Sequence, residues 1–371
     1  MVLFLRCNEV VFDSRAMKYL KYYRNNNINY RIIGWDRQGN ANGAPEGSIY
    51  FTRCAGFNVG GITAMINRIL WMLFLIKTLI RTGKKGDVLH ACDLDCAFPA
   101  VIYKLMFNRK VRIIFDVFDW YSSLMSTQPG FILLCFKWME RMSVRFSDHI
   151  IICEPERRSQ IPFDFPEEKM SILPNIPYFE DTSFLKKDKE YQFDNDNVTF
   201  AYVGTFSWER YLDEIITLAQ EGVINLNIAG YGETAIMNRL EEIKDLPNIR
   251  YYGKVNYQKA QIIMYNSDVI YAMYASVSPN NVFAAPNKYY EAMFLGKPLF
   301  TNSGTILEKK IKENGTGFIC DESFDSIKTV VGRIRMDEAV VMGEKAHGLW
   351  NSKFATYTSE YLNNVYSKMI S

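Results

Sequence analysis

Lys288 and Glu291, a lysine and a glutamate three positions apart, point most directly to ligand chemistry in this 371-residue chain. In the stretch APNKYYEAMFLGKP, Pro286 can open a helix with Asn287 and Lys288 in its first turn, and Gly296 can end it. Such a helix start offers free N–H groups and a positive dipole to a phosphate, and a lysine adds a full charge. A carboxylate one turn on can accept both hydroxyls of a ribose, although an ordinary exposed Lys/Glu pair is the simpler alternative.

Three turns in which a strand runs into glycine precede that helix. In YVGTFSWERYL, Gly204 lets the backbone approach a pyrophosphate, and Arg210 offers it a planar fork of donors. Gly230 follows the strand-like NLNIA, and Gly253 and Lys254 follow IRYY, where backbone groups can meet the edge of a base. Each turn alone is a weak signal, but together with the helix they predict a nucleotide site. The dinucleotide fingerprint G-x-G-x-x-G is absent, which disfavours NAD.

Polar residues also follow the strand-like segments of the first half of the chain. Asp13 and Arg15 open a predicted helix, Asp95 follows the segment DVLHACD, and Asp119 follows FDVF. The carboxyl ends of parallel strands are where a binding cleft needs such side chains. We therefore assign these four to an acceptor or donor-sugar side, with a helix cap or turn role as the alternative for Asp13. His90, between Leu and Ala, fits a core histidine better than a ligand.

Short apolar runs alternate with longer periodic segments, the pattern of βαβ units with parallel sheets. A chain of this length favours two domains. We predict an α/β protein with two Rossmann-like, doubly wound domains, at 1–185 and 198–345, and a terminal helical segment, 346–371, that crosses back to the first. The charged, apolar-poor stretch 178–197 is expected to connect them.

Composition excludes several function classes. The net charge of +2 and the dispersed basic residues argue against nucleic acid as a partner. Seven cysteines, an odd number in a long chain, read as buried reduced thiols of a cytosolic protein. Cys92 and Cys96 are four apart, but three histidines in the chain make a metal site a weak alternative. The first residues, MVLFLRC, lack the flanks of a signal peptide and predict a strand.

Ile62–Ile80 is a nineteen-residue apolar stretch interrupted by Asn67, Arg68, Lys77 and two threonines. It has no clean polar face. If this stretch spanned a bilayer, Arg68 and Lys77 would lie inside the membrane, at a cost of roughly 2.5–3.5 kcal/mol each near the centre. A core helix, and a helix with one face on the sheet and the other on the membrane interface, remain the two main alternatives. Arg81, Lys84 and Lys85 would suit anionic lipid heads.

These motifs, in the order Gly204 turn with Arg210, AGYGE, NIRYYGKV, SDVI and PNKYYEAMFLGKP, resemble retaining glycosyltransferases of the GT-B fold, family 4, in the branch that builds bacterial surface polysaccharides. The resemblance implies two domains facing a central cleft, a nucleoside-diphosphate sugar as donor, and a glycan or lipid-linked oligosaccharide as acceptor. It implies that Arg210, Lys288 and Asp119 are catalytic, and that Gly204, Gly230, Gly253, Lys254, Asn287 and Glu291 bind the donor nucleotide. Neither a cofactor nor a metal is expected. The implied location is cytoplasmic, with peripheral contact at the inner face of the cell membrane.

Two positions depart from the family pattern. Phe283 stands where the first of two glutamates is common, and Phe118 stands where a histidine is often found. The departure at Phe283 leaves the donor sugar undefined. Two other functions therefore stay open: a nucleotide-sugar epimerase of the same fold, and a non-catalytic partner subunit of a membrane glycan assembly.

Overall fold

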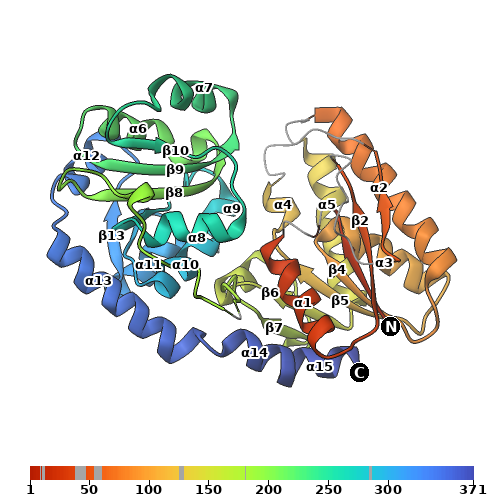
Figure 1. The fold of residues 1–371 in the computed structure, drawn as a ribbon. Coiled ribbons are helices and arrows are strands. Elements are labelled where there is room, and N and C mark those ends of the chain that lie inside the picture. The colour runs from red at the N-terminus through yellow and green to blue at the C-terminus, as the bar shows by residue number, and fades with distance from the viewer. Residues whose placement is uncertain are drawn as a thin grey trace. The chain divides into compact units, whose positions relative to one another are not determined.

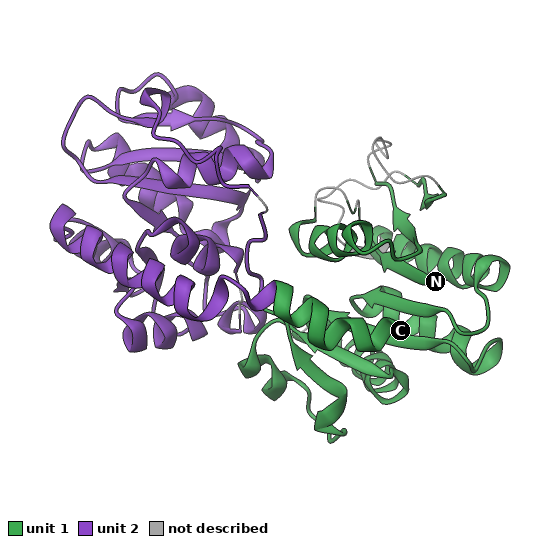
Figure 2. Ribbon diagram, turned by 60° about the horizontal axis from the view of Figure 1, so that its bottom comes forward, with its two compact units in different colours: residues 1–174, 359–371 green, residues 175–358 purple. Residues whose placement is uncertain are grey.

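The computed structural model describes residues 1–8, 10, 13–37, 47–53, 61–124, 129–179, 181–283 and 286–371. The chain divides into two compact units (Figure 2): residues 1–174 with 359–371, and residues 175–358. The predicted boundary at 185 lies later than this division. The predicted connection 178–197 packs within the second unit, because Tyr191 is 5% exposed and its carbonyl accepts a hydrogen bond from the buried Asn227 side chain.

The first unit is built on a parallel sheet in the order β3-β2-β1-β4-β5-β6-β7 (Figure 1). Its strands are β1 (Val2–Arg6), β2 (Tyr30–Trp35), β3 (Ile49–Phe51), β4 (Val88–Cys92), β5 (Arg112–Val117), β6 (His149–Ile152) and β7 (Met170–Ile172). Its principal helices are α1 (Ser14–Asn25), α2 (Gly61–Thr82), α3 (Leu94–Met106), α4 (Tyr121–Leu124) and α5 (Gly130–Phe146). The sequence analysis did not predict the short strands β3 and β7.

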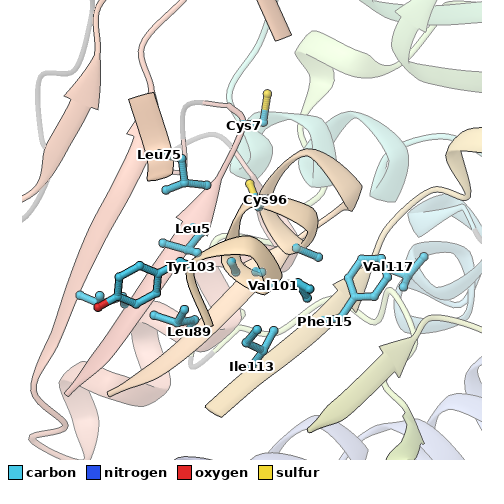
Figure 3. Close-up of a cluster of buried hydrophobic side chains, with 14 of the residues drawn as sticks. Leu5, Cys7, Leu75, Leu89, Cys96, Val101, Tyr103, Ile113, Phe115 and Val117 are labelled. Carbon is cyan, nitrogen blue, oxygen red and sulfur yellow. The ribbon is translucent and has the colours of Figure 1, made fainter. Parts of the chain in front are cut away.

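Alternation along the strands divides the core of this unit into two layers. Leu5, Leu89, Ile113 and Phe115 pack with residues of α2 and α3, as Figure 3 shows for part of this cluster. On the other face, the ring of Phe4 packs against Tyr19 and Tyr23 of α1 and against His90. Period-two alternation in a sheet covered on both faces produces this arrangement.

Helix α3 begins at Leu94, two residues after the end of β4. Pro99 lies inside it and has no N–H to donate to the carbonyl four residues back, at Asp95. The indole of Trp71 on α2 donates to that carbonyl instead, at 3.1 Å. The Trp71 side chain thus provides the donor that the Asp95 carbonyl lacks because of Pro99, and this hydrogen bond joins α2 to α3.

The second unit contains a parallel sheet in the order β10-β9-β8-β11-β12-β13. The strands are β8 (Thr199–Phe206), β9 (Asn225–Gly232), β10 (Ile249–Tyr251), β11 (Val269–Tyr271), β12 (Leu299–Asn302) and β13 (Gly317–Cys320). The helices are α6 (Leu212–Gln220), α7 (Thr234–Ile243), α8 (Tyr257–Tyr265), α9 (Pro279–Val282), α10 (Asn287–Leu295), α11 (Ile306–Asn314), α12 (Phe324–Val331) and α13 (Met336–Leu349). Two doubly wound parallel sheets confirm the predicted fold class of the two domains.

After α13 the chain continues through helical segments at Trp350–Phe354, α14 (Tyr357–Tyr361), Leu362–Tyr366 and α15 (Ser367–Ile370). From residue 359 onward it belongs to the first unit. Tyr366 is fully buried there, and its hydroxyl bonds His90 Nδ1 at 2.6 Å and also meets the hydroxyl of Tyr23. The end of the chain is therefore a structural part of the first unit.

Candidate functional site

The glycines predicted to meet a nucleotide lie side by side at the carboxyl ends of three neighbouring strands of the second unit. Gly204 of β8 pairs with Gly230 of β9, and the Gly230 N–H donates to the Gly253 carbonyl at 2.8 Å. A Cβ on Gly230 would lie 1.9 Å from the Gly204 carbonyl oxygen, and its φ of +155° is one that side chains avoid. Glycine here lets the strands approach and leaves their backbone groups uncovered.

Lys288 reaches the same place from α10. Pro286 precedes the helix, Asn287 and Lys288 form its first turn, and Gly296 ends it with φ of 65°, as the sequence predicts. A Cβ on Gly204 would lie 2.9 Å from the Lys288 ammonium nitrogen. That lysine therefore lies over the end of β8, next to the position that a side chain at 204 would take.

Two charged side chains, Glu291 and Arg210, act on this ammonium group. Burial lowers the pKa of Lys288 to about 8, with the Glu291 carboxylate opposing the shift and the Arg210 guanidinium adding to it. Glu291 itself is 4% exposed and hydrogen-bonds the hydroxyl of Tyr257. Two half-buried cations held close together form a site that an anion would stabilise.

Arg210 is positioned by residues that the sequence analysis did not single out. Its guanidinium lies 4.2 Å from the ring centroid of Tyr274, and Nη1 donates to Asn281 Oδ1 at 3.5 Å. Asn281 is 5% exposed and also donates to Glu209 and to the Ala275 carbonyl. Asn281 and Tyr274 come from the segment between β11 and α10, far along the chain from Arg210, so spacing gave no signal for them.

Lys254 stands apart from this group of cations. Its Nζ lies 4.9 Å from the ring centroid of Tyr231, just beyond Gly230. It is therefore placed at the Gly253 edge of the cradle, which we define as Gly204, Gly230, Gly253, Arg210, Lys288 and Glu291. A separate cavity of about 790 Å³, lined among others by Phe294, Lys297 and His347, lies at the other end of α10 and contains none of these residues.

The polar residues of the first unit gather at the carboxyl ends of β1, β4 and β5, with Asp93 at their centre. Its carboxylate accepts from Arg6 Nη1 at 2.5 Å and from the N–H groups of Phe118 and Asp119 at 2.9 and 3.1 Å. Burial raises the pKa of Asp93 to about 7, although the Arg6 charge opposes it. The sequence analysis missed both Asp93 and Arg6, which come from different strands.

Three of the four predicted acceptor-side residues have side chains that are at most about a tenth exposed and are enclosed by their partners. Asp13 caps α1 and accepts from Arg6 at 2.8 Å, which agrees with the cap alternative. Arg15 is 4% exposed and forms an ion pair with Asp116 at 2.6 Å. Asp95 is 1% exposed and accepts from the Tyr121 hydroxyl at 3.0 Å. Their burial favours positioning of the strand ends over contact with a ligand.

Asp119 is the predicted residue that remains accessible in this group. Its side chain is 46% exposed, and Arg157 lies 3.6 Å from it while donating to the Phe118 carbonyl. The ring of Phe118, which departs from the family pattern, lies 4.1 Å from the Arg6 guanidinium and 5.1 Å from that of Arg15. The aromatic face therefore shields two arginines that hold the carboxylates behind it.

A buried group of His90, Cys92 and Asp116 has the residue types of a metal site, with ligand atoms within 4.8 Å of one another. Asp116 and His90 already have partners in the protein, and His90 Nε2 lies 3.4 Å from Asp116 Oδ2 without a hydrogen bond of its own. Asp116 accepts from Arg15 and from the Tyr19 hydroxyl at 2.9 Å, and His90 Nδ1 bonds Tyr366. Burial opposes the charge on Asp116, yet Arg15 and His90 hold its pKa below the usual range. We interpret this group as a structural network that joins α1, β4, β5 and the end of the chain.

Comparison with known proteins agrees with this geometry. Residues 183–336, within the unit that carries the cradle, match the model of the family Glycosyl transferases group 1. No curated protein sequence matches the chain significantly.

Several solved structures share the fold over the whole chain. Sucrose-phosphate synthase from Thermosynechococcus elongatus has a TM-score of 0.72 at 11% identity, covering 100% of this chain and 99% of that one. HepE from Anabaena, in complex with UDP and glucose, has a TM-score of 0.68 at 11% identity, with 99% of each chain covered. WaaG, a glycosyltransferase of lipopolysaccharide biosynthesis, has a TM-score of 0.66 at 13% identity, with 100% of each covered. The chain therefore has the GT-B fold of glycosyltransferases.

Proposed function

We propose that this chain is a retaining glycosyltransferase of family 4, which moves a sugar from a nucleoside-diphosphate sugar to a glycan or lipid-linked acceptor in the synthesis of a bacterial surface polysaccharide. The observation that carries the proposal is the Lys288 ammonium group over Gly204, flanked by Arg210 and Glu291. The solved structure of HepE contains UDP and glucose, and a similar one from E. coli contains UDP-2-fluoro glucose.

The cradle fits the parts of a nucleoside diphosphate. Lys288, the first turn of α10 and the backbone at Gly204 bind the diphosphate, and Arg210 adds a planar pair of donors. Glu291, one turn along α10, accepts the ribose hydroxyls. Gly253 and Lys254 lie beside β9, where the base can meet exposed backbone groups. Asn287, in the first turn of α10, lines the same end of the helix.

The reaction breaks the bond between the anomeric carbon and the diphosphate oxygen, and the diphosphate leaves with the electron pair. The acceptor hydroxyl oxygen bonds to the same face of that carbon, and its proton passes to the leaving phosphate oxygen. Lys288 and Arg210 stabilise the charge that develops on the diphosphate, which is electrostatic catalysis by preorganised cations. With these two cations in that role, we expect activity to persist in EDTA.

Asp119 is the candidate for the acceptor side because its carboxylate is accessible while its backbone is fixed by Asp93. It orients the acceptor hydroxyl through a hydrogen bond. The arginine pair beneath Phe118 keeps the strand ends in place. Because Asp119 acts on the acceptor and the cradle holds the donor, we expect the loss of Asp119 to raise the KM for the acceptor more than it weakens donor binding.

A transfer assay tests the proposal. The full chain is incubated with a panel of nucleotide sugars and extracted glycan or lipid-linked acceptors, and the product's anomeric configuration is read by NMR. We expect transfer with retention by the wild type, at least a hundredfold loss in Lys288→Met, and normal activity in the control Lys244→Met, whose lysine is exposed and paired with Glu241. An inverted product, or rapid epimerisation of a nucleotide sugar without acceptor, would contradict the proposal.

A further inference from the structure

The helical layer of α2, α3 and α5 on the first unit carries an unusual amount of exposed apolar surface. On α5, Phe131, Leu134 and Trp138 are 70%, 67% and 56% exposed. These positions follow i, i+3, i+7 spacing and so form one stripe along the helix. The ring of Trp138 packs edge-on against Phe98 of α3 at 5.4 Å, which fixes it at the boundary of the two helices.

Helix α2 continues this surface. Its inner face is fully buried at Trp71, Leu75 and Leu79, whereas Ile66, Ile69, Leu73 and Ile80 are 47–57% exposed. The helix is long and apolar enough to cross a membrane by length and composition, and 28% of that stretch is buried within the protein. With Trp71 bonded to α3 and the inner face packed on the sheet, α2 is held flat against the domain. Crossing a bilayer would require breaking both contacts.

The charges around this surface are predominantly cationic. In sequence, α2 contains no carboxylate, and α3 and α5 contain one each, Asp95 and Glu140, both 1% exposed. Among the residues that the structure describes, the exposed cations on and directly after the helices are Lys77, Arg81, Lys84, Lys85, Arg109, Lys110, Lys137, Arg141 and Arg145. Asp148, two residues after α5, is an exposed carboxylate in this region, and it forms an ion pair with Lys104 at 2.6 Å. An apolar stripe bordered by an excess of lysine and arginine complements an anionic lipid surface.

The orientation of the helices adds to the argument. Helices that return between parallel strands begin at the carboxyl edge of the sheet, the edge where Asp93 and Asp119 lie. Phe131 and Leu134 lie in the first half of α5, and Trp138 and the basic residues at 137, 141 and 145 come later along the helix. The apolar stripe of α5 therefore starts nearest that edge, while Ile80 of α2 and Met106 of α3 extend the exposed apolar surface toward the opposite edge.

We infer that the outer face of α2, α3 and α5 docks on an anionic membrane, with Phe131, Leu134 and Trp138 inserted at the interface and the surrounding lysines and arginines on the lipid head groups. This extends the contact predicted for Ile62–Ile80 alone to a three-helix face in which α5 contributes the aromatic anchor. Aromatic side chains favour the interface, and each cation near an anionic surface adds on the order of 1 kcal/mol. The docking stands independently of the proposed sugar transfer.

Cosedimentation of the full chain with vesicles tests the inference. We expect binding to phosphatidylcholine vesicles containing one quarter phosphatidylglycerol, weaker binding to pure phosphatidylcholine, and release at high salt. The triple variant Phe131→Ser, Leu134→Ser, Trp138→Ser should bind the anionic vesicles at least tenfold more weakly. The control Val340→Ser, Val341→Ser, which removes exposed apolar residues from α13 of the other unit, should bind as the wild type does.

Two measurements keep the outcome decisive. Equal melting temperatures show that the triple variant is folded, and light scattering shows whether the face instead joins two copies of the chain. Equal vesicle binding by wild type and triple variant would overturn the inference, as would a dimer that the triple substitution abolishes without any vesicle binding. Transfer to a soluble acceptor, measured in parallel, separates a failure of docking from a failure of the proposed reaction.

Discussion

The substitution Lys288→Met tests two effects of the Lys288 charge separately: its cost to the stability of the free protein and its contribution to ligand binding. The pKa of Lys288 is lowered from 10.5 to about 8, so the folded protein at pH 7 holds a charge that burial disfavours. This lowering of the Lys288 pKa corresponds to a free energy of roughly 3 kcal/mol at most. Because the folded state disfavours the protonated form, removing the charge relieves that cost. Methionine keeps the length of the side chain, and we expect the free variant to be about 1–3 kcal/mol more stable at pH 7.

Ligand binding should change in the opposite direction. A charge-assisted hydrogen bond to a diphosphate contributes about 1.5–3 kcal/mol, so the variant should bind a nucleoside diphosphate about 10–150 times more weakly. Wild-type binding should also weaken as the pH rises through about 8, since the lysine must be protonated to hold the anion, and this pH dependence should be absent from the variant. Calorimetric titration from pH 6.5 to 9.5, with thermal melting of the free proteins, measures both effects. A variant that is less stable and binds normally would refute the reasoning.

Three further substitutions test the surrounding structure by denaturant unfolding. Gly230→Ala should destabilise the fold by more than about 3 kcal/mol, because its Cβ would lie 1.9 Å from a carbonyl oxygen. The control Gly222→Ala has open space around it and should cost only about 1–2 kcal/mol. Equal costs would contradict the close approach of the strands at Gly230. Because the pKa of Asp93 is raised, the free energy of unfolding of the wild type should fall as the pH rises from about 4 to 7. Over that range, Asp93→Asn should lose roughly 2–4 kcal/mol less stability than the wild type. The same pH dependence in both proteins would contradict the burial of the Asp93 charge. Tyr366→Phe should cost about 1–3 kcal/mol, because His90 Nδ1 and the Tyr23 hydroxyl both lose the Tyr366 hydroxyl as a partner. No change in stability would show that the network does not hold the chain end.

The sequence predicted most of the sheet framework and the cradle because those signals are local. Pro286 and Gly296 mark both ends of α10, and a strand that runs into glycine is legible within a few residues. Gly204 and Gly230 then meet because β8 and β9 are neighbours in register. Within the second unit, therefore, the predicted residues come together once the order of the strands is known.

The residues that the sequence did not reveal depend on contacts between distant segments. Asp93 meets Arg6 across 87 positions, and Asn281 meets Arg210 across 71, so neither pair has a spacing signal. Arg15 and Asp95 were chosen because they follow strand ends, and both are enclosed by partners from other strands and helices. Burial of a polar side chain at a strand end depends on tertiary packing, and composition alone cannot distinguish it from exposure.

Nucleoside diphosphate binding by the cradle is the central claim, and calorimetric titration of the wild type with UDP, ADP, GDP and their sugars at pH 7 tests it most directly. The account predicts that at least one of these nucleotides binds in a one-to-one ratio and that Lys288→Met weakens its binding at least tenfold. Absence of binding by every nucleotide in a folded, monodisperse sample, or equal affinity of wild type and variant, would contradict it.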